Sequence, residues 1–158
     1  MEKSTKSSLE TQKFAAALAK NIVSLREIPR SGTKEKALSG AQVFALVGEL
    51  GSGKTAFTQG FAKGLGVTEK ILSPTFIIMN KFALSSDRAL RYLYHIDCYR
   101  LDNPAKELLH LGFKKIIADP HAIVVIEWAD RIKKILPRDT LWIRFEHGDK
   151  NKRSITIW

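Results

Sequence analysis

The first hydrophobic pattern along the chain has helical spacing. Its apolar side chains recur every three or four residues: Phe14, Leu18, Ile22 and Leu25. This period places them on one face of an amphipathic helix, which we predict over about 8–27, with a capping box that begins at Ser7. A second helix is predicted over 56–65, and a third from Asn103 to about Gly112.

Apolar runs with strand character separate these helices. Four such segments are predicted to contain strands: 42–47, the later part of 73–82, 91–96 and 122–126. The run over 122–126 is apolar throughout, which is typical of a central strand buried on both faces. Near the C-terminus, apolar and polar residues alternate on both sides of Gly148-Asp149, which predicts an antiparallel hairpin. Helices and strands intermix, so the predicted class is α/β with a mixed sheet between helices.

Length and cysteine usage narrow the class of protein. With 158 residues we expect a single domain over 1–158, in which residues 1–7 are flexible. Cys98 is the only cysteine, which excludes an intrachain disulfide and a secreted disulfide scaffold. The sequence contains no apolar run of the roughly 18 residues that a membrane span needs, and no apolar signal core near Met1. We therefore expect a cytoplasmic protein that does not enter a membrane.

The formal net charge of +10 raises the question of a nucleic-acid partner. Residues 1–40 hold 8 basic and 4 acidic side chains, residues 41–100 hold 7 and 4, and residues 101–158 hold 11 and 8. The excess is thus spread along the chain, and the longest basic cluster is Lys150-Asn151-Lys152-Arg153. A generally basic surface, rather than a dedicated binding arm, is the prediction.

One segment matches the phosphate-binding pattern G-x-x-x-x-G-K-[ST] in full: Gly48, Glu49, Leu50, Gly51, Ser52, Gly53, Lys54 and Thr55. It lies between the strand predicted over 42–47 and the helix predicted over 56–65, which is the context that a P-loop requires. Glycines let the backbone N–H groups of the loop surround a phosphate. Lys54 supplies positive charge to the outer phosphates, and the Thr55 hydroxyl can bind Mg²⁺. The sequence therefore predicts nucleotide binding.

A P-loop also needs a carboxylate at the end of a neighbouring strand to organise the metal. Glu127 follows the most apolar strand and fits best, while Asp97 follows the strand over 91–96 and can take either role. Both are candidates to bind Mg²⁺ or to orient the attacking water. Thr75 is a candidate to sense the γ-phosphate, and Trp128 to stack on a base or a partner or to pack in the core.

The sequence favours ATP over GTP as the bound nucleotide. A guanine reader of the form Asn-Lys-x-Asp is expected on a late strand, and Asn80-Lys81-Phe82-Ala83 lacks the acid and comes too early. From the residues alone, three functions remain open: an ATPase that works with a protein partner, a small-molecule kinase, and a nucleic-acid-binding NTPase.

Four segments, taken in order, resemble the bacterial TsaE (YjeE) family over about residues 8–158. They are the P-loop, Ser73-Pro74-Thr75-Phe76, His95-Ile96-Asp97-Cys98-Tyr99-Arg100-Leu101 and Ile126-Glu127-Trp128. The resemblance implies a P-loop NTPase fold and a weak ATPase. By position it implies that Lys54 and Thr55 contact phosphate and Mg²⁺ and that Thr75 is a switch-like residue. Asp97 and Glu127 would lie near the metal and the water, with Trp128 beside them.

The same resemblance implies a partner. The family binds the TsaD–TsaB heterodimer, which transfers a threonylcarbamoyl group to adenosine 37 of tRNAs that read ANN codons. TsaE does not perform the transfer, but its ATP binding and hydrolysis support turnover of the complex. The evenly spread positive charge is compatible with work beside tRNA.

Overall fold

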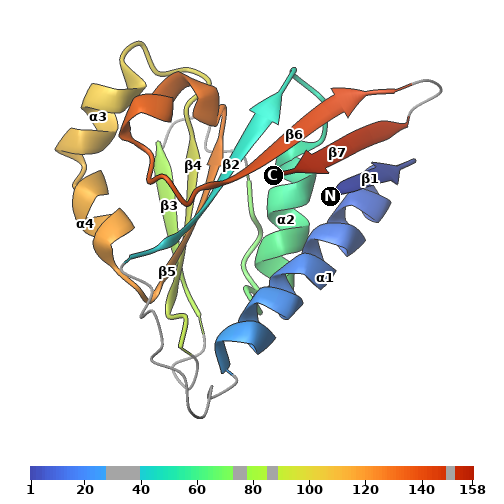
Figure 1. Ribbon diagram of the computed structural model, residues 1–158, viewed down its shortest axis with the longest axis horizontal. Helices are drawn as coiled ribbons and strands as arrows, with labels where there is room; N and C mark the ends of the chain where they lie inside the picture. Colours follow the sequence, from blue (N-terminus) through green and yellow to red (C-terminus); the bar gives the residue numbers. More distant parts are fainter. Residues whose placement is uncertain (28–39, 73–77, 85–88, 149–151) are drawn as a thin grey trace.

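The strands of the protein assemble into one mixed sheet with helices against it (Figure 1). The computed structural model describes residues 1–27, 40–72, 78–84, 89–148 and 152–158. In chain order the elements are β1 (Glu2–Thr5), α1 (Ser8–Glu27), β2 (Gln42–Gly48), α2 (Lys54–Gly64), β3 (Met79–Ala83), β4 (Tyr92–Asp97), α3 (Pro104–His110), α4 (Phe113–Ala118), β5 (Ala122–Glu127), the 3₁₀-helix η1 (Ala129–Ile135), β6 (Leu141–His147) and β7 (Arg153–Ile157).

Parallel pairing brings the carboxyl ends of several strands to one edge of the sheet. Within the described residues, seven strands follow the order β1-β7-β6-β2-β5-β4-β3. β2 pairs in parallel with β5 on one side and β6 on the other, and β5 pairs in parallel with β4. β3, β7 and β1 join antiparallel at the two margins. In sheets of this kind ligands bind beyond the carboxyl ends of the strands.

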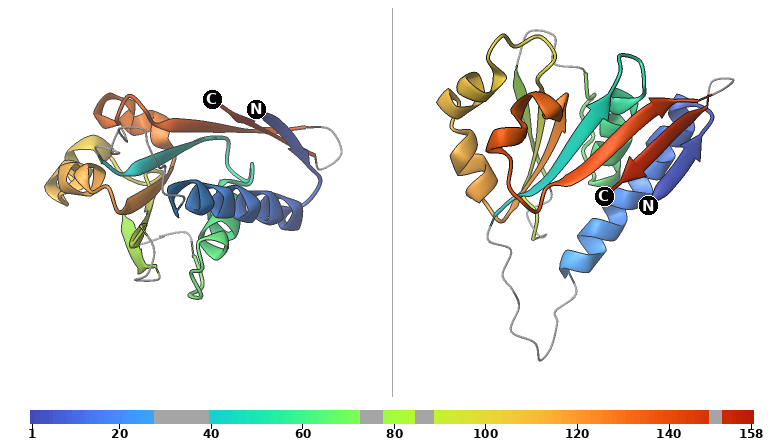
Figure 2. Two further views of the ribbon diagram at one scale, coloured as in Figure 1. Left: turned by 60° about the horizontal axis from the view of Figure 1, so that its bottom comes forward. Right: turned by 45° about the horizontal axis from the view of Figure 1, so that its top comes forward.

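Helices cover both faces of the central strands (Figures 1 and 2). α1 and α2 lie on one face, and α3, α4 and η1 lie on the other. All six residues of β5 are buried, because the strand lies between the two layers. This burial is the physical reason for the continuous apolar run over 122–126.

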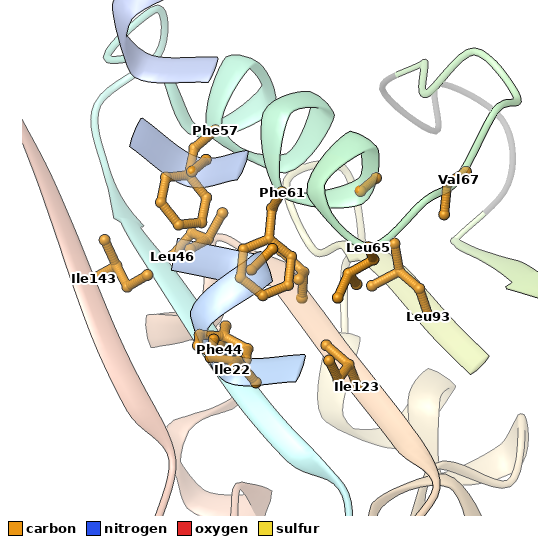
Figure 3. Packing of buried hydrophobic residues seen from close by; sticks show 14 of the residues in the cluster. Ile22, Phe44, Leu46, Phe57, Phe61, Leu65, Val67, Leu93, Ile123 and Ile143 are labelled. Carbon is orange, nitrogen blue, oxygen red and sulfur yellow. The ribbon is translucent and has the colours of Figure 1, made fainter. Parts of the chain in front are cut away.

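Phenylalanines pack α2 against the sheet. Phe57 and Phe61 point from α2 toward the strands (Figure 3). The ring centroids of Phe61 and Phe44 are 4.9 Å apart, and those of Phe57 and Phe145 are 5.5 Å apart in an edge-on arrangement. Close packing of these rings fixes the helix axis, and with it the position of the first helical residue, Lys54, at the sheet edge.

Two glycines of α2 let α1 cross it closely. A Cβ atom on Gly60 would lie 2.2 Å from the carbonyl oxygen of Gln12, and one on Gly64 would lie 2.5 Å from that of Ala16. Any larger residue at these positions would force the helices apart. The glycines within α2 therefore serve helix packing rather than ligand binding.

The predicted fold class and most predicted elements are confirmed. The helix predicted over 8–27 is α1, and the Ser7 Oγ accepts a hydrogen bond of 3.1 Å from the backbone N–H of Glu10. The apolar runs predicted as strands correspond to β2, β4 and β5, and the predicted C-terminal hairpin is formed by β6 and β7.

Two features differ from the sequence predictions, and one predicted segment is not tested. Residues 1–7 were expected to be flexible, whereas Glu2–Thr5 form β1 and pair with β7. This polar edge strand is held by backbone hydrogen bonds and lacks the apolar alternation that reveals strands. The helix predicted from Asn103 to about Gly112 is α3, which ends at His110, while Gly112, with a φ of 82°, caps a separate helix, α4. Residues 73–77, at the start of the predicted 73–82 segment, lie outside the described residues.

Among the helices that the structure describes, none combines the length and the apolar character needed to cross a membrane.

Candidate functional site

The predicted P-loop connects the central strand β2 to α2 at the carboxyl edge of the sheet. Gly48 has a φ of 144°, and a Cβ atom there would lie 2.3 Å from the carbonyl oxygen of Phe145 on β6. Gly53, which caps α2, has a φ of 109°. Both positions need glycine because other residues disfavour this backbone conformation. The loop thus delivers the unpaired N–H groups and positive dipole end of α2 to the sheet edge.

Lys54 folds back into its own loop. Its Nζ donates hydrogen bonds of 2.7 Å to the carbonyl oxygens of both Gly48 and Glu49, and the side chain is only 4% exposed. Burial lowers the pKa of this ammonium group, while the carboxylates of Glu127, Asp97 and Asp130 act to raise it. The charge is therefore held by loop carbonyls at the place where a P-loop lysine meets phosphate.

Glu127 connects the loop to the end of the neighbouring strand β5. Its Oε2 accepts a hydrogen bond of 2.9 Å from the Thr55 hydroxyl, and the residue is 2% exposed. Its Oε1 accepts a bond of 3.4 Å from the Thr58 hydroxyl and lies 3.0 Å from His95 Nε2. Since a carboxylate only accepts hydrogen bonds, the contact with His95 places a proton on Nε2. The carboxylate is thus oriented by groups from two other elements, α2 and β4.

Asp97 lies beside Glu127 at the same edge of the sheet. The two acids are register partners at the ends of β4 and β5. Asp97 is half-buried, and its Oδ1 accepts a hydrogen bond of 2.9 Å from the backbone N–H of Tyr99. The bond from Thr55 goes to Glu127, so the geometry favours Glu127 as the carboxylate that pairs with the P-loop hydroxyl.

Trp128 follows Glu127 in a left-handed backbone conformation, with a φ of 58°. This turn directs its ring toward the loop, where the Lys54 Nζ lies 4.1 Å from the ring centroid. The ring also packs on Tyr99, with 4.9 Å between centroids. Trp128 is half-buried and forms a wall of the site. It is therefore neither fully packed in the core nor fully exposed on the surface.

Hydrogen bonds from Arg131 connect the segments that follow β4 and β5. Arg131 donates from one guanidinium nitrogen to the carbonyl oxygens of Cys98 and Tyr99. Burial raises the pKa of the Cys98 thiol to about 12, so it is a packed, unreactive group at neutral pH. These contacts hold Asp97 and Trp128 in place relative to each other.

The structure brings together most of the predicted site residues. Lys54, Thr55, Asp97, Glu127 and Trp128 lie around the loop, whereas Thr75 lies outside the described residues. Sequence reasoning missed the role of Thr58, although its position one turn after Thr55 on α2 carried a signal. The contact of His95 with Glu127 joins two strands and had no signal in the sequence.

The donor atoms at this edge suit a hard cation. The Thr55 hydroxyl and the Glu127 carboxylate supply oxygen ligands of the kind that Mg²⁺ prefers together with phosphate oxygens. Within the described residues, no group of three or more His, Cys, Asp or Glu side chains has the arrangement of a self-sufficient metal centre. The residues present therefore fit a metal ion that arrives with a phosphate ligand.

A pocket of about 790 Å³ opens beside the first half of the loop. Its lining includes Glu49, Leu50, Trp128, Trp142 and Trp158. Leu50 is 69% exposed at the tip of the loop. The site is thus open to solvent next to Trp128, on the side of the sheet that carries η1.

The family model and the similar curated proteins all point to the same family. The chain matches the family description "Threonylcarbamoyl adenosine biosynthesis protein TsaE" over residues 5–155. The protein of that function from Bacillus subtilis is 38% identical over 115 residues, which cover 73% of this chain and 68% of the relative. Its counterpart from Nostoc is 36% identical over 123 residues, covering 76% and 72%.

A solved structure is also similar. The crystal structure of YdiB from Bacillus subtilis superposes with a TM-score of 0.68 at 28% sequence identity, covering 99% of this chain and 83% of that one. The mixed sheet, the P-loop between β2 and α2 and the carboxylate at the end of β5 are the fold of a P-loop NTPase. On this evidence the chain belongs to the TsaE family of tRNA threonylcarbamoyladenosine biosynthesis proteins.

Proposed function

We propose that this protein binds and slowly hydrolyses ATP with Mg²⁺, and thereby supports a TsaD–TsaB pair during threonylcarbamoylation of tRNA in the cytoplasm. The observation that carries the proposal is the bond of 2.9 Å between the P-loop hydroxyl of Thr55 and the buried carboxylate of Glu127. This pairing unites the two groups that a P-loop enzyme uses to organise a metal-bound nucleotide.

The loop and α2 supply the nucleotide site. Backbone N–H groups between Gly48 and Thr55 would surround the β-phosphate, and the dipole of α2 favours its negative charge. Lys54 would exchange its carbonyl partners, Gly48 and Glu49, for phosphate oxygens when ATP enters. Trp128 would then lie against the nucleotide side of the loop, because its ring already covers the Lys54 ammonium.

Hydrolysis would proceed by attack of a water on the γ-phosphorus, with ADP as the leaving group. Thr55 and Glu127 would hold Mg²⁺, which would neutralise negative charge on the phosphates of the nucleotide. Lys54 would stabilise the negative charge that spreads over the transferred phosphoryl oxygens. Glu127, oriented by His95 and Thr58, would be the first candidate to orient the attacking water. Asp97, its register partner at the same edge of the sheet, is the second candidate.

The open side of the site supports a role for a protein partner. The pocket beside Leu50 and Trp128 would leave one side of the bound nucleotide open to solvent, and incomplete exclusion of water disfavours fast hydrolysis. A partner that covers this pocket would exclude water and would add groups to the transition state. Exposed apolar area at Leu50 is suitable for such a contact.

The proposal is tested by nucleotide-dependent capture. The tagged protein is incubated with purified TsaD–TsaB pair in Mg²⁺ with ATP, with ADP or without nucleotide, and the retained proteins are quantified. We expect retention that depends on the nucleotide. Equal retention in all three conditions, or none in any, contradicts the proposal. Salt-sensitive retention of RNA without the protein pair would instead support a nucleic-acid-binding NTPase, and ATP consumption that requires a small acceptor would support a kinase.

A further inference from the structure

Arg153 belongs to the longest basic cluster of the sequence, to which the proposed function assigns no role. It is the first residue of β7 and pairs in register with His147, the last residue of β6. Because β7 runs antiparallel to β6, its first residue lies at the same edge of the sheet as the P-loop. Arg153 also shares its strand face with Ile155, which is buried in the core beneath α1 and α2. Its side chain is therefore directed to the face on which α2 begins.

The side chain of Arg153 reaches the P-loop itself. An ideal Cβ atom on Gly53 would lie 3.1 Å from Arg153 Cδ and 3.4 Å from its Nε. Gly53 is the residue immediately before Lys54 and caps α2. A side chain at Gly53 would press on the arginine at this distance, and the φ of 109° also favours glycine there.

Within the part of the chain that the structure describes, one N–H of the Arg153 guanidinium is left unpaired in the free protein. Among the described residues, Arg153 Nε is buried and has no hydrogen-bond partner. An unpaired buried N–H of a charged group is unfavourable, and such groups are rare unless a ligand or water completes them. An anion bound in the adjacent loop would provide the acceptor.

The position of Arg153 also identifies which part of the nucleotide it would meet. Glu127 and Thr55 mark the metal and γ-phosphate side of the loop, toward β5. Arg153 lies on the opposite side of β2, beyond β6. A nucleotide whose γ-phosphate is at Glu127 would have its α-phosphate and sugar toward β6 and β7.

We propose that Arg153 binds the α-phosphate of the nucleotide held in the P-loop, an assignment that rests on the proposed function. Its contact would then be shared by ATP and ADP and would contribute to binding rather than to cleavage of the γ-phosphate. The bond would be charge-assisted, which is the strong class of protein hydrogen bond.

The test is calorimetric titration of ATP and of ADP, each with Mg²⁺, into the full-length wild type, R153Q, R153K and the neighbouring control K152Q. R153Q is expected to raise the Kd of ATP and of ADP by the same factor, roughly 10- to 100-fold. R153K is expected to recover part of the loss, because it keeps the charge but not the planar fork. K152Q, which removes an exposed charge, should leave both constants within about twofold.

The outcomes separate this assignment from the proposed function. The unfolding midpoint of nucleotide-free R153Q should equal or exceed that of the wild type, since the variant removes a buried unpaired N–H from the free protein. A loss of affinity for ATP but not ADP, or unchanged affinity for both, would overturn the assignment while leaving the proposed function intact. If R153Q does not fold, equal affinity of R153K and the wild type overturns it. A wild type that binds neither nucleotide overturns both.

Discussion

Replacement of Lys54 by alanine should remove measurable ATP hydrolysis and weaken ATP binding by about 100-fold or more. Lys54 is the buried cation at the mouth of the loop, and three carboxylates act on its charge, so its removal leaves them without this partner. These carboxylates would then oppose the binding of a triphosphate more strongly. The loss in turnover should reach about 10³-fold, the size typical of deleting one preorganised group that stabilises transition-state charge.

The Lys54 prediction is checked by steady-state phosphate release and by calorimetric titration of ATP. Lys63→Ala is the matched control, since it removes an exposed lysine from the last turn of the same helix. The control should keep wild-type affinity and rate. If the Lys54 variant folds with a wild-type unfolding midpoint yet hydrolyses ATP at the wild-type rate, the loop is not the catalytic nucleotide site.

Replacement of Glu127 by glutamine should reduce turnover by about 10²- to 10³-fold while ATP binding stays within about tenfold of the wild type. The amide has nearly the same shape as the carboxylate and retains one oxygen to accept a bond from Thr55 or Thr58. It lacks the negative charge that holds a divalent cation. The rate and the dependence on Mg²⁺ concentration should therefore change more than the affinity for the nucleotide.

Single-turnover hydrolysis over a range of Mg²⁺ concentrations, together with the Kd of ATP, separates these effects. Glu69→Gln, at an exposed position, is the control for loss of one negative charge. A Glu127→Gln variant with an unchanged rate would transfer the metal-organising role to Asp97, its register partner. Substitution by alanine is less informative, because it would leave Thr55 and His95 without the carboxylate that they contact.

The central part of the fold could be predicted because local pattern and environment agree there. β5 is buried on both faces, so its apolar run is unbroken, and the P-loop glycines are demanded by backbone conformations that other residues disfavour. The sheet margin could not be predicted in the same way. β1 consists of Glu2, Lys3, Ser4 and Thr5 and is held by backbone pairing with β7, which leaves no periodic pattern.

The residues of the candidate site also fall into those that the sequence predicts and those that it does not. Lys54 and Thr55 follow from a contiguous motif, and Glu127 follows from its place after an apolar strand. The contacts of His95 and Arg153 depend on which strands are neighbours and on strand direction, which the order of residues does not encode locally. Long-range pairing of this kind becomes visible only when the sheet order is known.

The most direct test of the central claim is the rate of ATP hydrolysis by the wild-type protein with Mg²⁺, measured alone and with increasing purified TsaD–TsaB pair. Partner-supplied groups accelerate other P-loop enzymes by factors of about 10³ or more, and we predict a saturable rise of at least about tenfold here. The rise should be absent when Lys54 is replaced by alanine. A rate that stays constant as the pair is added in excess, or a rise that persists in the Lys54 variant, would contradict a partner-dependent ATPase centred on this loop.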